Sequence, residues 1–160
     1  MIIGDKRKFA AEFDLDDNYS KLLDGTFTYW INSQRLVSEK ESVYLNDVYM
    51  SMIWFNYDLG HRKYAEHITD DLNKIFEDIY DSIYNSDTFD SCPARYDISI
   101  NVNGIDRYTI FYIEDNSSGY LLYKENTDDV VNTFKIEKGE VDNVLSDTFS
   151  ELNRLYESVH

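Results

Sequence analysis

Cysteine, proline and long apolar runs are nearly missing from this chain of 160 residues. Its single thiol, Cys92, excludes an internal disulfide and a zinc site built from cysteines. No apolar run approaches the ~20 residues that a membrane-spanning helix needs, and the segment Met1–Lys8 lacks the apolar stretch of a secretory signal. One proline and six glycines form no linker. These absences predict a soluble, cytoplasmic protein with a single domain over residues 1–160.

Basic residues are also scarce, because 15 Lys and Arg stand against 31 Asp and Glu and leave a formal net charge of −16 at pH 7. An excess of carboxylates repels phosphate backbones and anionic lipid heads, so we predict no direct nucleic-acid partner and no membrane partner. The same charge favours encounter with a basic protein. An acidic surface can also serve solubility alone, so the position of the acids is more informative than their number.

The densest long acidic stretch runs from Tyr64 to Asp97, with nine acids and two bases in 34 residues. Within it, apolar residues recur at helical spacing from Ile68 to Ile83, which predicts an amphipathic helix. The other face carries Lys74 as its only base and four acids, Glu66, Asp70, Glu77 and Asp81. Tyrosine beside carboxylates suits a partner rich in Arg and Lys. We therefore predict a partner-binding site at Asp70, Glu77, Asp78, Asp81, Tyr84, Asp87 and Asp90.

The remaining periodicities predict an α+β fold, with a mainly antiparallel sheet and about three packed helices. Alternation favours a strand over 8–15, Asp24-Gly25 a turn, and the β-branched and aromatic run 26–31 a second strand. A turn at 32–34 leads into a brief strand at 35–37. Ser42 is the expected N-cap of a helix that Gly60 ends. Further strands are expected at 98–102, 107–114, 120–123 and 130–136, with a hairpin turn at Asn103-Gly104 and a last helix over 141–159.

Candidate catalytic residues are isolated. His61 and His67 are six residues apart, which does not place them on one helical face, and His160 is the terminal residue. Cys92 has no neighbouring base in the sequence. Carboxylate pairs occur, but 31 acids in 160 residues produce several by chance, and none completes a calcium loop. We predict no catalysis, no cofactor and no metal. Examples of such pairs are Asp16-Asp17, Asp70-Asp71, Glu114-Asp115 and Asp128-Asp129.

The first 32 residues carry a more specific signal. It consists of the opening Met1-Ile2-Ile3-Gly4-Asp5, the strand Lys8-Phe9-Ala10-Ala11-Glu12-Phe13, and the segment Gly25-Thr26-Phe27-Thr28-Tyr29-Trp30-Ile31-Asn32. These segments resemble the polymorphic-toxin immunity proteins of family forty-two, which begin M-I-[IF]-G-[DN]-x-x-x-F-A and continue with G-x-F-x-x-W-I-N-G. Ser33 stands where that family often has glycine, and Lys6-Arg7-Lys8 is more basic than its pattern. The predicted order of later elements is also similar.

The resemblance implies a cytoplasmic antidote that binds the toxic C-terminal domain of a secreted effector, delivered by contact-dependent inhibition or by a type VI system. Many such toxins are nucleases, and a nuclease needs a positive groove that an acidic protein can fill. An alternative is an acidic nucleic-acid mimic that inhibits a DNA-binding protein, although Lys74 interrupts the row of acids that such a mimic needs. A small acidic hydrolase or metal-dependent enzyme is a third interpretation.

Overall fold

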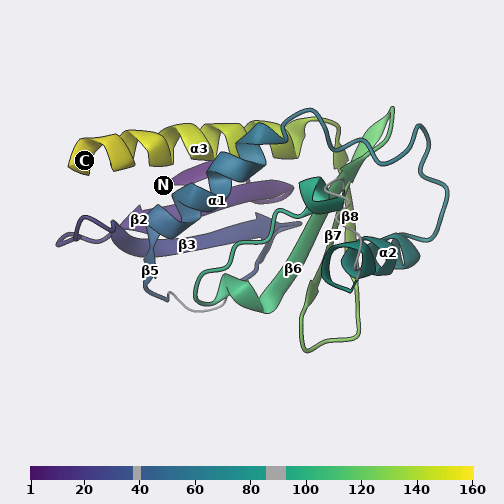
Figure 1. Ribbon diagram of the computed structural model, residues 1–160, viewed down its shortest axis with the longest axis horizontal. Helices are drawn as coiled ribbons and strands as arrows, with labels where there is room; N and C mark the ends of the chain where they lie inside the picture. The colour runs from purple at the N-terminus through teal and green to yellow at the C-terminus, as the bar shows by residue number, and fades with distance from the viewer. Residues whose placement is uncertain (38–40, 86–92) are drawn as a thin grey trace. The chain divides into compact units, whose positions relative to one another are not determined.

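The computed structural model describes residues 1–37, 41–85 and 93–160, and Figure 1 shows their path. The chain forms two compact units. Unit 1 comprises Met1–Leu59, Ile100–Asp106 and Glu140–His160, and unit 2 comprises Gly60–Ser99 and Arg107–Gly139. Each unit has its own antiparallel sheet, and the described residues form three α-helices. The predicted α+β class is therefore confirmed, with the strands divided between two sheets.

The sheet of unit 1 follows the alternation of the N-terminal sequence. Its strands are paired in the order β1-β2-β3-β4, and β5 also pairs with β3. Phe9, Ala11 and Phe13 are buried and lie opposite buried residues of the neighbouring strand, so the predicted strand over 8–15 is confirmed. The strands are β1 (Ile2–Asp5), β2 (Phe9–Leu15), β3 (Asp24–Ile31), β4 (Gln34–Arg35) and β5 (Val43–Tyr44).

Two turns of unit 1 test the sequence interpretation in opposite ways. The turn predicted at Asp24-Gly25 is wrong, because both residues belong to β3 and pair with β5. A Cβ on Gly25 would lie only 2.2 Å from the backbone oxygen of Asp14, so glycine permits close strand packing there. The predicted turn after Ile31 is confirmed: Asn32 and Ser33 both have positive φ, 51° and 66°, as a two-residue hairpin turn requires.

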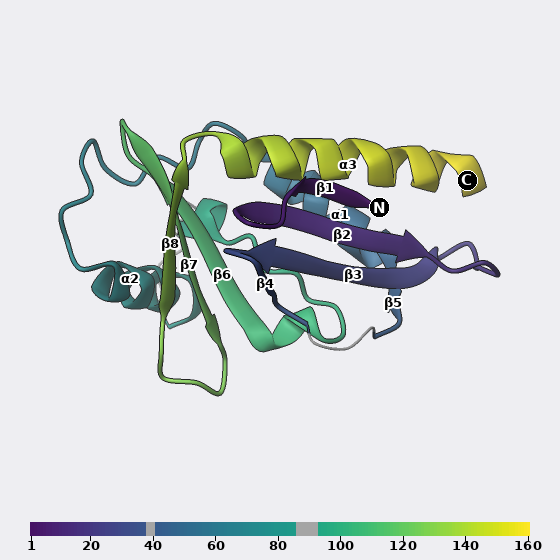
Figure 2. The same cartoon turned by 180° about the vertical axis from the view of Figure 1, so that it is seen from behind.

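Two helices pack together in unit 1 and cover one face of its sheet, as the two views in Figures 1 and 2 show. They are α1 (Leu45–Tyr57) and α3 (Glu140–Val159), and the second confirms the predicted C-terminal helix. The Tyr49 ring stacks on Tyr156 at 4.8 Å between centroids, and the Tyr49 hydroxyl donates to Asn153 Oδ1 at 2.7 Å. Ser42 is not the N-cap of α1, because β5 intervenes and Tyr44 occupies the cap without a side-chain hydrogen bond.

Unit 2 contains α2 (Leu72–Tyr84) and a sheet in the order β6-β7-β8. The strands are β6 (Tyr108–Glu114), β7 (Ser118–Glu125) and β8 (Asn132–Glu137), which confirms the three later strands. Helix α2 packs on this sheet, and the Phe76 ring lies 4.9 Å from the Phe111 ring. The core of the unit is a cluster of buried residues: Ile75, Phe76, Ile79, Tyr96, Phe111, Ile113 and Leu122.

The segment before β6 differs from the prediction. Residues 98–102 do not form a strand element, and Asn103-Gly104 leads into a short 3₁₀ helix, Ile105–Arg107, instead of a hairpin. Ile98, Ile100 and Val102 are nevertheless buried. Alternating apolar residues report burial of every second side chain, which an irregular segment also achieves when it packs along a core. Among the helices of the described residues, none is long and apolar enough to cross a bilayer.

Candidate partner-binding site

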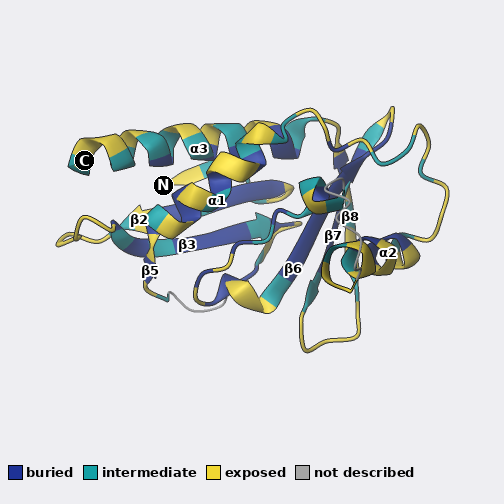
Figure 3. Cartoon of the chain, in the orientation of Figure 1, coloured by how far each residue is buried: buried dark blue, intermediate teal, exposed yellow. Residues whose placement is uncertain are grey.

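The acidic face predicted from the sequence lies mainly on α2. The Asp71 side chain accepts a hydrogen bond from the backbone N–H of Asn73 at 3.0 Å and so caps the start of the helix. Ile75, Phe76 and Ile79 then face the core of unit 2. Because these residues fix which side of α2 is buried, the residues between them face solvent, as the exposed outer side of α2 in Figure 3 shows.

Glu77, Asp78 and Asp81 are the exposed acids of α2. Their spacing places them together on one side of the helix, and Asp70 precedes the capping residue. The Asp78 carboxylate lies 3.5 Å from Lys74 Nζ, and Asp81 Oδ1 accepts a hydrogen bond from Asn85 Nδ2 at 2.9 Å. The face is therefore anionic, with one opposite charge beside it.

Tyr84 ends α2 with its side chain half exposed. Its hydroxyl donates to Asp97 Oδ2 at 2.8 Å, and its ring lies 4.7 Å from the Tyr80 ring. Partial burial first, and then the charge of Asp97, raise the pKa of Tyr84 above its usual range. The hydroxyl is therefore a neutral donor that is already engaged, and the exposed part of the ring is what a partner could contact.

The structure brings together most of the predicted site. Asp70, Glu77, Asp78, Asp81 and Tyr84 lie on or next to α2. Asp87 and Asp90 lie outside the described residues. The predicted start of the helix near Ile68 is wrong, because the helix begins at Leu72 after the Asp71 cap. Glu66 and His67, which were expected on the helix, therefore belong to the segment that precedes it.

The buried carboxylate pair of unit 2 has a structural role. Glu114 Oε2 accepts hydrogen bonds from the Tyr112 hydroxyl at 2.7 Å and from the Gly139 backbone N–H at 2.8 Å. Asp115 accepts from the backbone N–H groups of Ser117 and Ser118 at 2.8 Å. These donors, Ser117 first, lower the pKa of Asp115 below its ordinary value of 3.8. Both carboxylates thus accept hydrogen bonds from donors within the fold.

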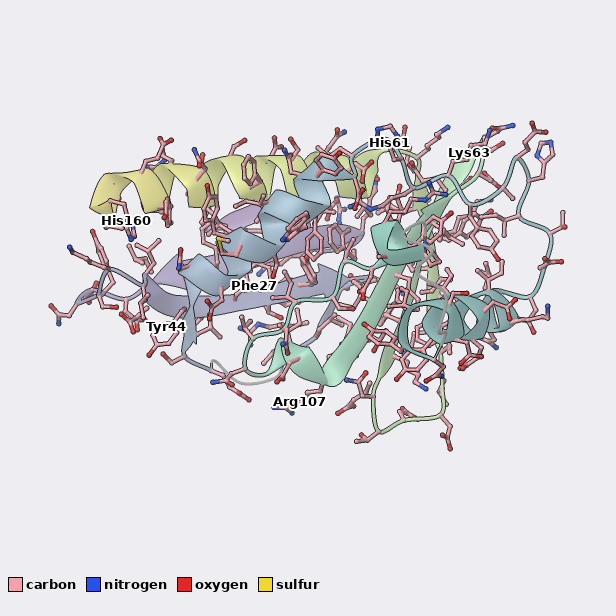
Figure 4. The ribbon with its side chains drawn as sticks, viewed as in Figure 1. Phe27, Tyr44, His61, Lys63, Arg107 and His160 are labelled. Atoms are coloured by element: carbon pink, nitrogen blue, oxygen red, sulfur yellow. The ribbon has the colours of Figure 1, made fainter. Side chains whose placement is uncertain are left out.

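Other candidate ligands and nucleophiles are dispersed. Among the described residues there is no group of three or more His, Cys, Asp or Glu that could hold a metal ion. His160 stacks on Tyr156 at 4.2 Å between ring centroids, at the C-terminal end of α3, where Figure 4 labels it. His61 and His67 are exposed, and Cys92 lies outside the described residues.

A second surface, on α1, was not predicted. Four large apolar side chains of this helix are exposed: Met50, Ile53, Trp54 and Tyr57. The apolar content of 45–57 was the available signal, because its large apolar residues exceed what one buried side of a helix of this length can hold. At the start of α1 lies a pocket of about 360 Å³. It is lined by Asp24, Ser42, Val43, Tyr44, Asp47, Asn101, Val102, Asn103 and Asp106.

The chain was compared with protein families, curated proteins and solved structures. The family profile described as Immunity protein 42 matches residues 1–151, a span that includes all of unit 2 and most of unit 1. The crystal structure of CdiI from Burkholderia dolosa AUO158 matches the chain with a TM-score of 0.75 and 16% sequence identity. The match covers 94% of this chain and 99% of that one, which shows a common fold. A search of curated proteins finds no match.

Proposed function

The chain belongs to the Immunity protein 42 family, and from this premise we propose that it neutralises a cognate bacterial toxin domain that is basic and of the nuclease type. The observation that carries the proposal is the family match over residues 1–151 in a chain with a net charge of −16. We also propose that it acts in the cytoplasm, as an antidote of a contact-dependent inhibition or type VI system, and that residues 1–160 work as one immunity-protein domain.

Charge supports the basic character of the toxin. Unit 1 holds 16 acids and 7 bases, and unit 2 holds 15 acids and 8 bases, so their formal charges are −9 and −7. The excess is therefore a property of both units. A nuclease must hold a phosphate backbone in a positive groove, and a protein that is anionic in both of its parts is attracted to such a groove from a distance.

The acidic face of α2 is the part of unit 2 that we assign to this attraction. Glu77, Asp78 and Asp81 project from a helix whose other side is fixed by the core, so their positions are set before a partner arrives. Charges that are already in place speed up association, because the helix does not have to change its orientation before its carboxylates meet the partner. We include Asp70, Tyr84, Asp87 and Asp90 in this binding site, together with those three acids.

Co-expression tests the proposal. The toxin domain encoded immediately upstream of this gene is induced in cells with and without the chain, and survival is counted. We expect full protection by the chain, and killing when a non-cognate immunity protein replaces it. Killing in the presence of well-expressed, folded chain would overturn the proposal. Capture of a general DNA-binding protein in place of the toxin would instead favour the nucleic-acid mimic, against which the 3.5 Å pair between Lys74 and Asp78 argues.

A further inference from the structure

The exposed side of α1 carries large apolar side chains in a continuous row. Trp54 is 69% exposed, Tyr57 is 80% exposed and Met50 is 50% exposed. These residues are three or four positions apart, so their side chains neighbour one another on the helix surface. Ile53 lies beside them and is also exposed. We call Met50, Ile53, Trp54 and Tyr57 the α1 stripe; Figure 3 shows exposed residues along this helix.

The α1 stripe is not needed to hold α1 in place. The opposite side of the helix supplies the buried residues, and Tyr49 stacks between Phe149 and Tyr156 of α3. A side chain that stays in water contributes little to folding, so a Trp and a Tyr at these exposures cost solubility without stabilising the unit. Trp and Tyr, with Arg, are enriched among the residues that dominate binding energy at protein interfaces.

The start of the helix gives this surface a charge. Asp47 is exposed and precedes Met50 by three residues, so it extends the row of the α1 stripe toward the N-terminal end of α1. Asp47 and Tyr44 also line the 360 Å³ pocket, and two further acids, Asp24 and Asp106, line it as well. The Ser20 side chain first, and then the Ser20 backbone N–H, which donates to Asp24 Oδ2 at 2.7 Å, lower the pKa of Asp24 and favour its ionised form. Figure 4 labels Tyr44 at the start of α1.

The charge selects the kind of partner. From Glu41 to Leu59 the chain has three acids and no Lys or Arg, and the residues that line the pocket also include no base. A second copy of this chain would bring the same anionic surface against itself, which like charges oppose. A basic protein surface with an apolar centre matches both features, because its apolar part can cover the rings while its Lys and Arg side chains approach the carboxylates.

We propose that the α1 stripe, with the acidic pocket at its end, is the surface that anchors the cationic toxin domain. This inference rests on the proposed function and places the main toxin-binding surface in unit 1. The acids of α2 act at long range and govern the association rate, whereas the rings of the α1 stripe, which the toxin covers on binding, govern the dissociation rate. In many complexes, long-range charge mainly sets the association rate and short-range packing mainly sets the dissociation rate.

The test uses the full chain and the purified toxin domain encoded immediately upstream. Trp54→Ala and Tyr57→Ala are compared with Leu22→Ala, which also truncates an exposed apolar side chain of unit 1. We expect Trp54→Ala to weaken the Kd by at least about 30-fold, the loss typical of a hot-spot residue. Leu22→Ala should stay within about 3-fold. Unfolding midpoints in urea should be nearly unchanged in all three, because the truncated side chains are exposed.

A spectroscopic measurement avoids truncation altogether. The chain has two tryptophans, so labelling with 5-fluorotryptophan gives two fluorine resonances, which the variant Trp30→Phe assigns. We expect the Trp54 resonance to shift when unlabelled toxin domain is added.

The charge at the start of α1 is tested by Asp47→Asn, which removes one charge and keeps the side-chain shape. This variant should weaken binding about 3- to 10-fold at low salt and less at high salt.

The outcomes separate the two proposals. If the wild-type chain neither binds the toxin domain nor protects cells, the proposed function and this inference both fail. If the wild-type chain binds and protects while Trp54→Ala binds equally well and the Trp54 resonance does not move, the function stands and this inference is overturned. It is also overturned if the wild-type chain is a dimer in sedimentation and Trp54→Ala is a monomer, because a second copy then covers the stripe.

Discussion

Reversal of four acids at the α2 face is the perturbation that most sharply separates binding from stability. The substitutions are Asp70→Lys, Glu77→Lys, Asp78→Lys and Asp81→Lys, and together they change the net charge from −16 to −8. Asp71 is left in place because it caps α2. We expect association with the toxin domain to slow by about 10- to 100-fold at low salt, since steering by complementary charge has about this size.

The structure sets an upper limit on the accompanying loss of stability. The ion pair between Lys74 and Asp78 joins side chains that are 71% and 55% exposed, so water screens it. The variant loses this ion pair and gains repulsion between Lys74 and the new lysine four residues later. Together these two effects cost about 0.5–1 kcal/mol. Asp81 also loses its exposed hydrogen bond from Asn85. We expect the free energy of unfolding to fall by about 1 kcal/mol in total, which leaves the fold intact.

The assay is stopped-flow association over a series of salt concentrations, with urea unfolding of the same samples. The control carries the same charge change at exposed acids of unit 1: Asp16→Lys, Asp17→Lys, Asp147→Lys and Glu157→Lys. We expect a larger effect from the α2 variant than from the control. Equal slowing by both variants would mean that only the total charge matters. No slowing by either, in chains that unfold normally, would refute the electrostatic reasoning.

Three further predictions concern folding. Asp71→Ala should lower the free energy of unfolding by about 1 kcal/mol in urea titrations, as loss of an N-cap does, whereas the neighbouring Asp70→Ala should have little effect. Ser33→Gly should raise it by about 0.5–1 kcal/mol, because a positive φ of 66° strains a residue with a Cβ; an unchanged midpoint would contradict this. Backbone donors, Ser117 first, lower the pKa of Asp115, so the ionised carboxylate stabilises the fold above its ordinary pKa of 3.8 and loses that contribution as the pH falls. Asp115→Asn should flatten this loss below about pH 4 in urea unfolding, and an identical acid profile would count against the role given to Asp115.

Local periodicity predicted most of the elements. The alternation from Phe9 to Leu15, the helical spacing on α2 and the apolar row on α3 each run long enough to select one structure. The exposed acids of α2 were predictable for the same reason, because the positions of the buried residues determine which side faces water.

Features that depend on distant residues were not predictable. The hydrogen bond from Tyr84 to Asp97 joins α2 to a residue beyond its end, and nothing in the spacing of the two residues indicates it. The exposure of Trp54 was missed for a different reason. Apolar residues at helical spacing predict burial, but they do not distinguish burial in a core from exposure on a binding surface. The division of the strands into two sheets also depends on pairing between separated segments.

A titration of toxin activity tests the central claim most directly. Purified chain is added in increasing amounts to a fixed amount of the toxin domain encoded immediately upstream, and the remaining toxin activity is measured. If the chain neutralises the toxin by binding it, activity should fall in proportion to the chain added and end at an equimolar ratio. Full toxin activity in excess chain would contradict the account, and so would complete inactivation by a small fraction of an equivalent, which would show that the chain acts catalytically.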